Sequence, residues 1–315
     1  MRKKKMMNKK HYIKSLVMLA TMMLAASCGS DGFDDEPQNV ADNTSLQEIR
    51  FNANVWRMMD GTRAFFYAIP DGLQSSGFGC VAYLDGTQYF SSHLAWNVSK
   101  WEFNDGKHYW PASGTLKFYG YSAVPSCFTS HTHASGNPQF TCTLPMTSDG
   151  SSDITNDQDD LLEFVYAKAT GTKAANGETG VTLNFQHPFT RINLKLSSTQ
   201  APIQINTITF KSIKNNGNYN DGTWTLTGDA TNLVVTANRN YSADDAIGSY
   251  LMIPQYWAGN IEVEATWVDW GLSLKHTLTT KVDAVTWAPG TSYTYTFTIT
   301  ETDLIVSSSK YTEQW

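Results

Sequence analysis

The sequence of 315 residues lacks the short motifs by which many enzymes are recognised. It has no G-x-S-x-G elbow, no H-E-x-x-H helix and no P-loop, and Gly77-Phe78-Gly79 has no third glycine at the spacing of a dinucleotide fingerprint. No paired carboxylate or nucleophile can be read beside His187, which we interpret as a structural residue at a strand junction. We therefore expect no enzymatic activity and no cofactor.

Basic residues are scarce outside the N-terminal segment. Residues 1–27 contain seven of the 23 Lys and Arg residues and no acidic residue, so the rest of the chain carries 16 basic against 29 acidic residues, a net charge of −13. A surface with this charge repels nucleic acid and anionic lipid headgroups. Nucleic-acid binding is therefore excluded as a function class.

Cysteine is also scarce. If Cys28 is modified, the three remaining cysteines are an odd number, and at most one disulfide can form among them. Cys127 and Cys142 are the candidate pair because they flank one loop-like stretch. The alternative is that Cys80, Cys127 and Cys142 are all small buried hydrophobic residues.

Two groups of residues have the chemistry of metal ligands, but we predict no metal site. His131-Thr132-His133 lies between Cys127 and Cys142, and these four side chains could bind zinc, the alternative being a solvated loop. Four aspartates could bind calcium through oxygen, yet they lack the ordered D-x-D-x-D-G loop and are better interpreted as a solvated acidic loop. They are Asp153, Asp157, Asp159 and Asp160.

The N-terminal segment has the pattern of an export signal. Arg2-Lys3-Lys4-Lys5 precedes an apolar stretch at 15–27 that is too short to span a bilayer as a helix. Because Cys28 follows Ala25-Ala26-Ser27, the segment resembles a bacterial lipoprotein signal, in which the cysteine is acylated (with palmitate, for example) and anchors the chain in the outer membrane. The alternative is an ordinary signal peptide with an incidental cysteine. Residues 28–46 predict an acidic, flexible tether.

The rest of the chain has the patterning of strands. Short runs of Thr, Val, Ile, Tyr, Phe and Trp alternate with polar residues, which predicts strands with one buried and one exposed face. Asp85-Gly86, Asp221-Gly222 and Asn215-Asn216-Gly217 are among the turn signals that separate these runs. No stretch after residue 30 has sustained helical periodicity, although 241–248 could form one helical turn. The clearest alternating runs are 49–55, 115–121, 181–185, 192–196 and 293–299.

This pattern predicts an all-β fold of antiparallel sandwiches, and the length of the exported chain suggests two domains. The run 167–177 is small, polar and glycine-bearing, so it has the composition of a linker or long loop. The predicted division is a signal peptide at 1–27, a tether at 28–46, an N-terminal β-sandwich at 47–172 and a C-terminal β-sandwich at 173–315.

Two tryptophans are candidates for ligand contact. Trp267 and Trp270 are three positions apart on a strand-like run, which places them on opposite faces. An exposed tryptophan could stack on a sugar ring, and the alternative is packing between sheets or domains.

Seven segments form an ordered set along the chain. They are Thr62-Arg63-Ala64, Lys107-His108-Tyr109-Trp110-Pro111, Leu116-Lys117-Phe118-Tyr119-Gly120-Tyr121, Asp160-Leu161-Leu162 with Tyr166-Ala167, Leu183-Asn184-Phe185-Gln186-His187-Pro188-Phe189, Leu251-Met252-Ile253-Pro254-Gln255 and Trp287-Ala288-Pro289-Gly290-Thr291-Ser292-Tyr293-Thr294-Tyr295. Behind a lipoprotein-like signal, this set resembles the fimbrillin family of Gram-negative anaerobes, whose members are lipoprotein precursors of adhesive fimbriae and their tip and accessory subunits. The resemblance covers most of 47–315 and implies two tandem transthyretin-like β-sandwiches.

The resemblance also implies assembly by donor-strand exchange. In the family, a trypsin-like protease removes an N-terminal strand after an arginine, so here the strand would be 49–55 and the cut would follow Arg63, with Arg50 and Arg57 as fallbacks. A strand from a neighbouring subunit would then fill the exposed groove. The alternative is that Thr62-Arg63-Ala64 begins an uncut second strand.

The donor would be the C-terminal tail, and the alternative is that this tail completes its own domain. The candidate donor residues are Leu304, Val306, Tyr311 and Trp315.

The sequence therefore favours a subunit or tip adhesin of a fimbria, or pilus, exported to the outer membrane and cell surface and incorporated into the fimbrium. Its expected partners are other fimbrial subunits, the processing protease, and a receptor or glycan on a host or bacterial surface. The alternative is a monomeric surface lipoprotein that binds a glycan or another host ligand.

Overall fold

The computed structural model of the protein describes residues 46–55, 69–146, 164–198, 202–242, 244–269, 272–300 and 303–311, which belong to one compact unit. No helix within these ranges is long and apolar enough to cross a membrane. The signal segment and residues 28–45 of the tether lie outside them. So do several residues to which the sequence assigns candidate roles, namely Cys28, Arg57, Arg63, Asp153, Asp157, Asp159, Asp160, Trp270 and Trp315.

The described residues form strands almost throughout, which confirms the predicted all-β class. Each of the five clearest alternating runs is a strand, because alternation lets one face pack while the other faces water. These strands are β1 (Phe51–Val55), β5 (Leu116–Tyr121), β9 (Val181–Phe185), β10 (Thr190–Ser198) and β20 (Ser292–Ile299).

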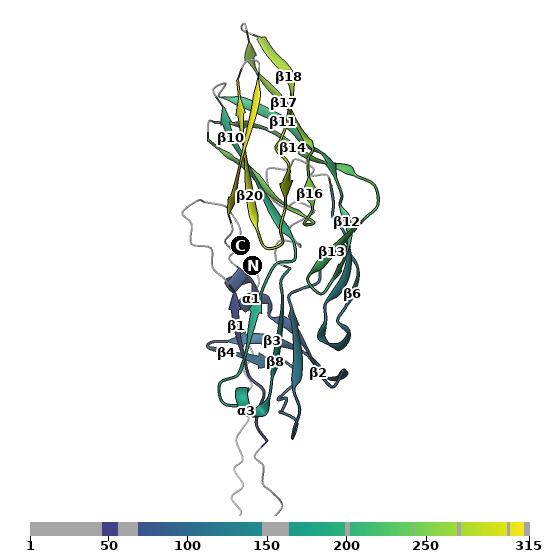
Figure 1. The fold of residues 1–315 in the computed structure, drawn as a ribbon. Helices are drawn as coiled ribbons and strands as arrows, with labels where there is room; N and C mark the ends of the chain where they lie inside the picture. Colours follow the sequence, from purple (N-terminus) through teal and green to yellow (C-terminus); the bar gives the residue numbers. More distant parts are fainter. Residues whose placement is uncertain are drawn as a thin grey trace, which may run out of the picture. The chain divides into compact units, whose positions relative to one another are not determined.

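A five-stranded antiparallel sheet of order β4-β3-β2-β5-β8 carries the N-terminal half (Figure 1). Asp85 and Gly86 join β2 to β3 with φ of 51° and 82°, the two positive values that two-residue hairpin turns favour. The Asp-Gly turn signal is thus confirmed here. The remaining strands of this sheet are β2 (Phe78–Leu84), β3 (Thr87–Asn97), β4 (Lys100–Phe103) and β8 (Tyr166–Gly171).

The parallel pair β1 and β9 packs against this sheet. Phe51 of β1 meets Phe118 of β5 edge to face, with ring centroids 5.2 Å apart. Phe185 of β9 meets Phe78 of β2 in the same way at 5.1 Å. Leu73 of the short helix α1 (Ile69–Ser76) is buried in this same core, which we call the N-terminal core.

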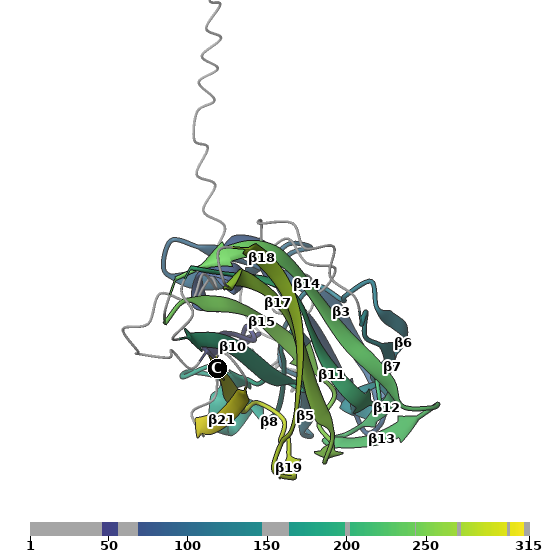
Figure 2. The same cartoon turned by 90° about the horizontal axis from the view of Figure 1, so that it is seen from above.

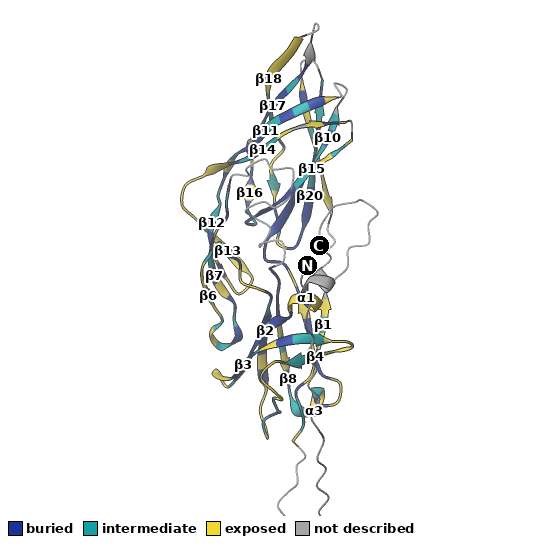
Figure 3. Ribbon diagram, turned by 180° about the vertical axis from the view of Figure 1, so that it is seen from behind, coloured by how far each residue is buried: buried dark blue, intermediate teal, exposed yellow. Residues whose placement is uncertain are grey.

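Two four-stranded sheets, of order β14-β11-β17-β18 and β15-β10-β20-β21, enclose the second and larger core (Figure 2). Phe210 of β11 and Tyr295 of β20 have ring centroids 5.5 Å apart, so the two sheets face each other. Figure 3 shows β20 buried along most of its length and β18 largely exposed. The other strands are β11 (Ile203–Ile213), β14 (Thr231–Tyr241), β15 (Ala246–Met252), β17 (Asn260–Asp269), β18 (Leu272–Lys281) and β21 (Leu304–Tyr311).

A further sheet, of order β13-β12-β7-β6, joins hairpins from distant parts of the chain. Its central pair, β7 and β12, is antiparallel and places Cys142 opposite Gly217. Asp221 and Gly222 turn β12 into β13 with φ of 45° and 99°, which confirms the second Asp-Gly turn. The strands are β6 (Phe128–Thr132), β7 (Gln139–Thr143), β12 (Asn216–Asn220) and β13 (Thr223–Thr227), and a separate small pair consists of β16 (Tyr256–Trp257) and β19 (Val285–Thr286).

Three local expectations are wrong. The predicted linker at 167–177 is mostly regular, because it contains β8 and then the short helix α3 (Lys173–Asn176), which the Thr172 hydroxyl caps by accepting from the backbone N–H of Ala175 at 3.2 Å. The expected turn at Asn215-Asn216-Gly217 is instead the start of β12. Where 241–248 could have formed a helical turn, β14 ends and β15 begins.

The division into two domains at residue 172 stays a prediction. Strand β9 follows that boundary in sequence, yet Val181, Leu183 and Phe185 are buried in the same core as Ile49 and Phe51. The N-terminal core is therefore built from both sides of the predicted boundary.

Candidate functional site

Strand β1 contributes alternate side chains to the N-terminal core. Ile49 and Phe51 are buried, whereas Arg50 and Asn52 between and after them are exposed. The strand pairs in parallel with β9, from Phe51 opposite Val181 to residue 55 opposite 185. Besides Phe118, Phe51 contacts the ring of Phe103 at 5.9 Å between centroids. One strand with a single strand partner thus fills part of an apolar core.

The residues just before β1 are held by the segment 107–110. The Ile49 N–H donates to the His108 carbonyl at 2.8 Å, and the Trp110 N–H donates to the Gln47 carbonyl at 2.9 Å. Lys107 forms an ion pair with Glu48 at 3.0 Å. We call this the N-terminal clasp, and it continues directly into the β1–β9 pairing. A polar hollow of about 360 Å³ lies beside it.

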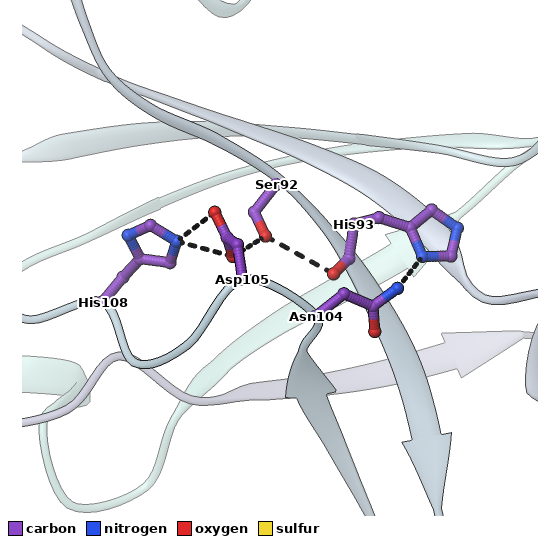
Figure 4. Close-up of polar contacts among 5 residues, drawn as sticks. All are labelled: Ser92, His93, Asn104, Asp105 and His108. Carbon is purple, nitrogen blue, oxygen red and sulfur yellow. Dashed lines mark hydrogen bonds and ion pairs between the residues drawn. The ribbon is translucent and has the colours of Figure 1, made fainter.

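A network of polar side chains supports the turn that carries His108 (Figure 4). The Ser92 hydroxyl donates to Asp105, whose carboxylate also lies 3.1 Å from His108 Nε2. Asn104 Nδ2 and His93 Nδ1 are 3.1 Å apart. The hydrogen bond from Ser92 lowers the pKa of Asp105, and His108 lowers it further.

This network has a triad's residue types but not a triad's order. In a hydrolase the histidine lies between the serine and the carboxylate, so that it can take the hydroxyl proton. Here Asp105 lies between Ser92 and His108. The imidazole instead stacks on Phe90, with centroids 4.4 Å apart and planes 18° from parallel. The arrangement orients the His108 backbone toward Ile49, which is a structural task.

Strand β21 is an edge strand that pairs with β20 over its whole length, from Leu304 opposite Ile299 to Tyr311 opposite Ser292. Leu304 is 8% exposed in the larger core and Val306 packs against that core, while Ile305 between them is 57% exposed. The strand is exposed from residue 307 to residue 310. Within 304–310, the apolar contacts of the strand with the core are therefore concentrated at Leu304 and Val306.

The predicted processing residues are only partly placed. Arg63, the first choice, and Arg57 lie outside the described residues. Arg50 has an exposed side chain, but its carbonyl accepts a hydrogen bond from Val181 N–H at 2.8 Å. A protease acting at Arg50 would have to open this part of the strand first.

The structure brings together Cys127 and Cys142, whose sulfur atoms are 3.1 Å apart as free thiols. The two candidate histidine ligands have other partners: His131 Nε2 lies 2.9 Å from the Tyr119 hydroxyl, and His133 Nδ1 lies 2.8 Å from the Tyr83 hydroxyl. Within the described ranges, no group of three or more His, Cys, Asp or Glu side chains is arranged to hold a metal ion.

Two other candidates are buried. Trp267 is 4% exposed and stacks on His276 with ring centroids 3.7 Å apart, so it offers no free face to a sugar ring. His187 is buried too, and burial together with the nearby Arg191 lowers its pKa to about 3. A neutral, buried imidazole at the end of β9 agrees with the structural interpretation of His187.

Sequence reasoning missed the clasp and its support. The sequence places Lys107, His108 and Trp110 in an ordered motif and indicates no role for Ser92. The available signal was Asn104-Asp105-Gly106, a turn sequence placed two residues before His108. Nothing local in the sequence indicates that residues 47–49 pair with 108–110.

Several solved structures have a fold similar to that of this chain. The matching structures include a fimbrial protein from Bacteroides vulgatus, with 17% identity, coverage of 85% of this chain and 99% of that chain, and a TM-score of 0.59. They also include a "putative cell adhesion protein" from Bacteroides ovatus (15% identity, 86% and 98% coverage, TM-score 0.56) and another from Bacteroides uniformis (15% identity, 87% and 99% coverage, TM-score 0.55). At these identities the likeness establishes the fold.

The search of curated proteins found no match. The family profile described as fimbrillin-like, however, matches residues 52–315. This match takes in β1 from its second residue, the clasp segment 107–110 and β21, and it agrees with the fold of the structural neighbours. The chain therefore belongs to the fimbrillin-like family.

Proposed function

We propose that the protein is a fimbrial subunit or tip adhesin that assembles by exchange of β-strands at the cell surface. The observation that carries this proposal is the position of β1, which fills the N-terminal core while pairing with β9 alone. The chain between β1 and α1, residues 56–68, contains both Arg57 and Arg63. Cleavage there would separate β1 from the rest of the protein.

Loss of β1 would create an acceptor groove. The backbone edge of β9 would lose its ladder partner, and the rings of Phe103 and Phe118 would lose their contacts with Phe51. An unpaired edge above an apolar surface is the site that a strand from a second subunit can complete. The acceptor would thus exist only after processing.

The donor in this proposal is β21. Its alternate residues Leu304 and Val306 pack into the larger core, as Ile49, just before β1, and Phe51, within it, pack into the N-terminal core. Donation requires β21 to leave β20, with which it pairs within its own chain. Among residues 304–310, whose side chains the structure describes, only Leu304 is buried, so release of this part of the strand exposes little apolar surface.

The proposal includes export through the signal at 1–27 and acylation of Cys28, which would tether the unprocessed chain to the outer membrane. A trypsin-like protease would then act on Arg63. The fimbrillin-like family is structural rather than enzymatic, and the protein is not an enzyme. A monomeric, glycan-binding lipoprotein is the alternative, but the burial of Trp267 removes one of its two candidate platforms.

The test is the mass and N-terminal sequence of the protein purified from the surface of its native cells, in the wild type and in Arg63→Gln. A wild-type chain that starts at Ala64, with fibres visible by electron microscopy, supports the proposal, and Arg63→Gln should then keep its N-terminus and form no fibres. Arg57→Gln is the matched control and should behave as the wild type. A wild-type chain that retains acylated Cys28 within its fibres would contradict the proposed order of events.

A further inference from the structure

We propose that Cys127 and Cys142 are a modification site, at which the two thiols form a disulfide that staples the β6–β7 hairpin. The inference goes beyond assembly by strand exchange. It rests on the proposed export in one respect only, because disulfides persist in the oxidising conditions outside the cytoplasm.

The geometry places the two sulfur atoms within 3.1 Å of each other, about 1 Å more than the roughly 2.05 Å of an S–S bond. The backbones are also fixed relative to each other, since the Thr143 N–H donates to the Cys127 carbonyl at 3.1 Å. Cys142 lies in β7, and Cys127 directly precedes β6. The bond would close the open end of the hairpin.

The pairing of the hairpin is weak at the end where the disulfide would form. β6 is the edge strand of its sheet, and its pairing with β7 is irregular between Phe128 and Ser130, next to Cys127. The same hairpin places His131 and His133 against Tyr119 and Tyr83 of the five-stranded sheet. A covalent link beside the irregular pairing would hold these contacts in register.

The third described cysteine is separated from this pair. Cys80 is fully buried in the N-terminal core, among the strands β2, β3 and β5, whereas Cys142 lies in the larger core. The structure therefore selects one pair from the three combinations that Cys80, Cys127 and Cys142 allow, and it leaves Cys80 as a thiol.

The chemistry is a thiol–disulfide exchange with an oxidant of the disulfide class, such as a disulfide oxidoreductase or oxidised glutathione. Cys127, which is only partly buried, attacks the oxidant as a thiolate, forming a mixed disulfide and releasing one thiol. Cys142 then loses its proton and attacks the Cys127 sulfur, which releases the second thiol of the oxidant. Two electrons and two protons leave the protein, and the oxidant's disulfide becomes two thiols.

The experiment uses the purified full-length chain, once folded and once refolded from urea, in a glutathione redox buffer. The protein is then denatured in the presence of N-ethylmaleimide, which alkylates free thiols. Its disulfides are mapped by mass spectrometry of peptides prepared without reductant. The expected product is one cross-linked species joining the peptides of Cys127 and Cys142, with Cys28 and Cys80 alkylated. Alkylation of both Cys127 and Cys142 in both samples, or a link to Cys80, would overturn the proposal.

Thermal unfolding gives the second readout. The oxidised wild type should melt roughly 5–10 °C above the reduced protein, as expected for a closed loop of about 15 residues. Cys80→Ser is the matched control and should keep this shift, whereas Cys127→Ser/Cys142→Ser should lose it. A double variant that still responds to reductant would contradict the assignment. Because purified protein is used, the result does not depend on export, processing or fibre formation.

Discussion

Phe51 and Phe118 meet edge to face with their ring centroids 5.2 Å apart, although they belong to the two opposite sides of the N-terminal core. Phe118 lies in the five-stranded sheet, and Phe51 lies in the strand that precedes Arg57 and Arg63 in sequence. The core of the unprocessed protein is thus completed by a strand that cleavage at Arg63 would detach. A mutation in β1 should therefore change the stability of the unprocessed protein without changing that of the processed subunit.

Phe51→Ala should destabilise the unprocessed protein by about 3–5 kcal/mol, because it removes a buried ring and leaves a cavity beside Phe103 and Phe118. Urea unfolding of the full-length chain measures this change. Asn54→Ala, on the exposed face of the same strand, is the control and should stay within about 0.5 kcal/mol of the wild type.

After cleavage at Arg63 the same comparison should change. Once β1 has been exchanged for a strand from a neighbour, Phe51 is no longer part of the subunit, so Phe51→Ala fibres should match wild-type fibres in thermal stability. Fibres that remain weakened by Phe51→Ala would show that β1 is retained on assembly.

Gly180→Ala should weaken the docking of β1. Gly180 has φ of +79°, and a Cβ atom there would lie 3.1 Å from the carbonyl oxygen of Arg50, at the point where the β1–β9 pairing begins. Backbone strain and crowding together should destabilise the docked position of β1 by about 1–3 kcal/mol. Hydrogen exchange of the amides in 51–55 is the measurement, and it should become faster.

The matched control for this substitution is Gly106→Ala. Gly106 also has a positive φ, of +103°, but a Cβ atom there would have no neighbour within 4 Å. Gly106→Ala should lower the free energy of unfolding of the protein, but it should not accelerate hydrogen exchange in 51–55 more than elsewhere. Equal acceleration by both variants would mean that β1 docking does not depend on the close approach at Gly180.

Acid should destabilise the hairpin contacts through His131. Burial, and then the neighbouring His133, lower the pKa of His131 from 6.5 to about 4 in the folded protein. The unfolded chain therefore takes up a proton at higher pH than the folded chain does, and this contribution to stability is present above pH 6.5 and is lost as the pH falls toward 4.

The test compares urea unfolding midpoints at pH 7.5 and pH 4.5. His131→Gln keeps a group that can hydrogen-bond Tyr119 but cannot titrate, so it should lose less stability on acidification than the wild type. Thr132→Ser, at an exposed position of the same strand as His131, is the control and should keep the wild-type difference. An unchanged pH difference in His131→Gln would contradict this role for His131.

The sequence predicts most strands of this fold because their signals are local. Alternation along 293–299 and the Asp85-Gly86 turn each depend on a few adjacent residues, and both are confirmed. The start of β12 is an exception, because its local sequence predicts a turn and not a strand. Asn215-Asn216-Gly217 has the composition of a turn, yet Asn216 pairs with Thr143, whose hydroxyl donates to its side chain at 2.6 Å. Such pairing between distant segments overrides local propensity.

The candidate site shows the same limit. Burial of Leu304 and exposure of Ile305 follow from alternation, whereas the pairing of Glu48 with Tyr109 joins residues 61 positions apart. The functional roles of Arg63 and Cys28 depend on chemistry outside the described residues and stay predictions. The proximity of Cys127 and Cys142 also required the structure, because flanking a common loop does not specify how the hairpin closes.

Deletion of residues 303–315 should abolish polymer formation while leaving the monomer folded. The deletion removes the proposed donor strand, and the remaining edge strand β20 still pairs with β10 on its other side. Leu304→Ser should weaken assembly by removing a buried donor side chain, whereas Ile305→Ser, on the 57% exposed neighbour, should assemble normally. Fibre yield by electron microscopy and circular dichroism of the monomer are the two measurements. If the deleted chain still forms fibres, β21 is not the donor strand. It would then only complete its own sheet, and another strand would have to be the donor.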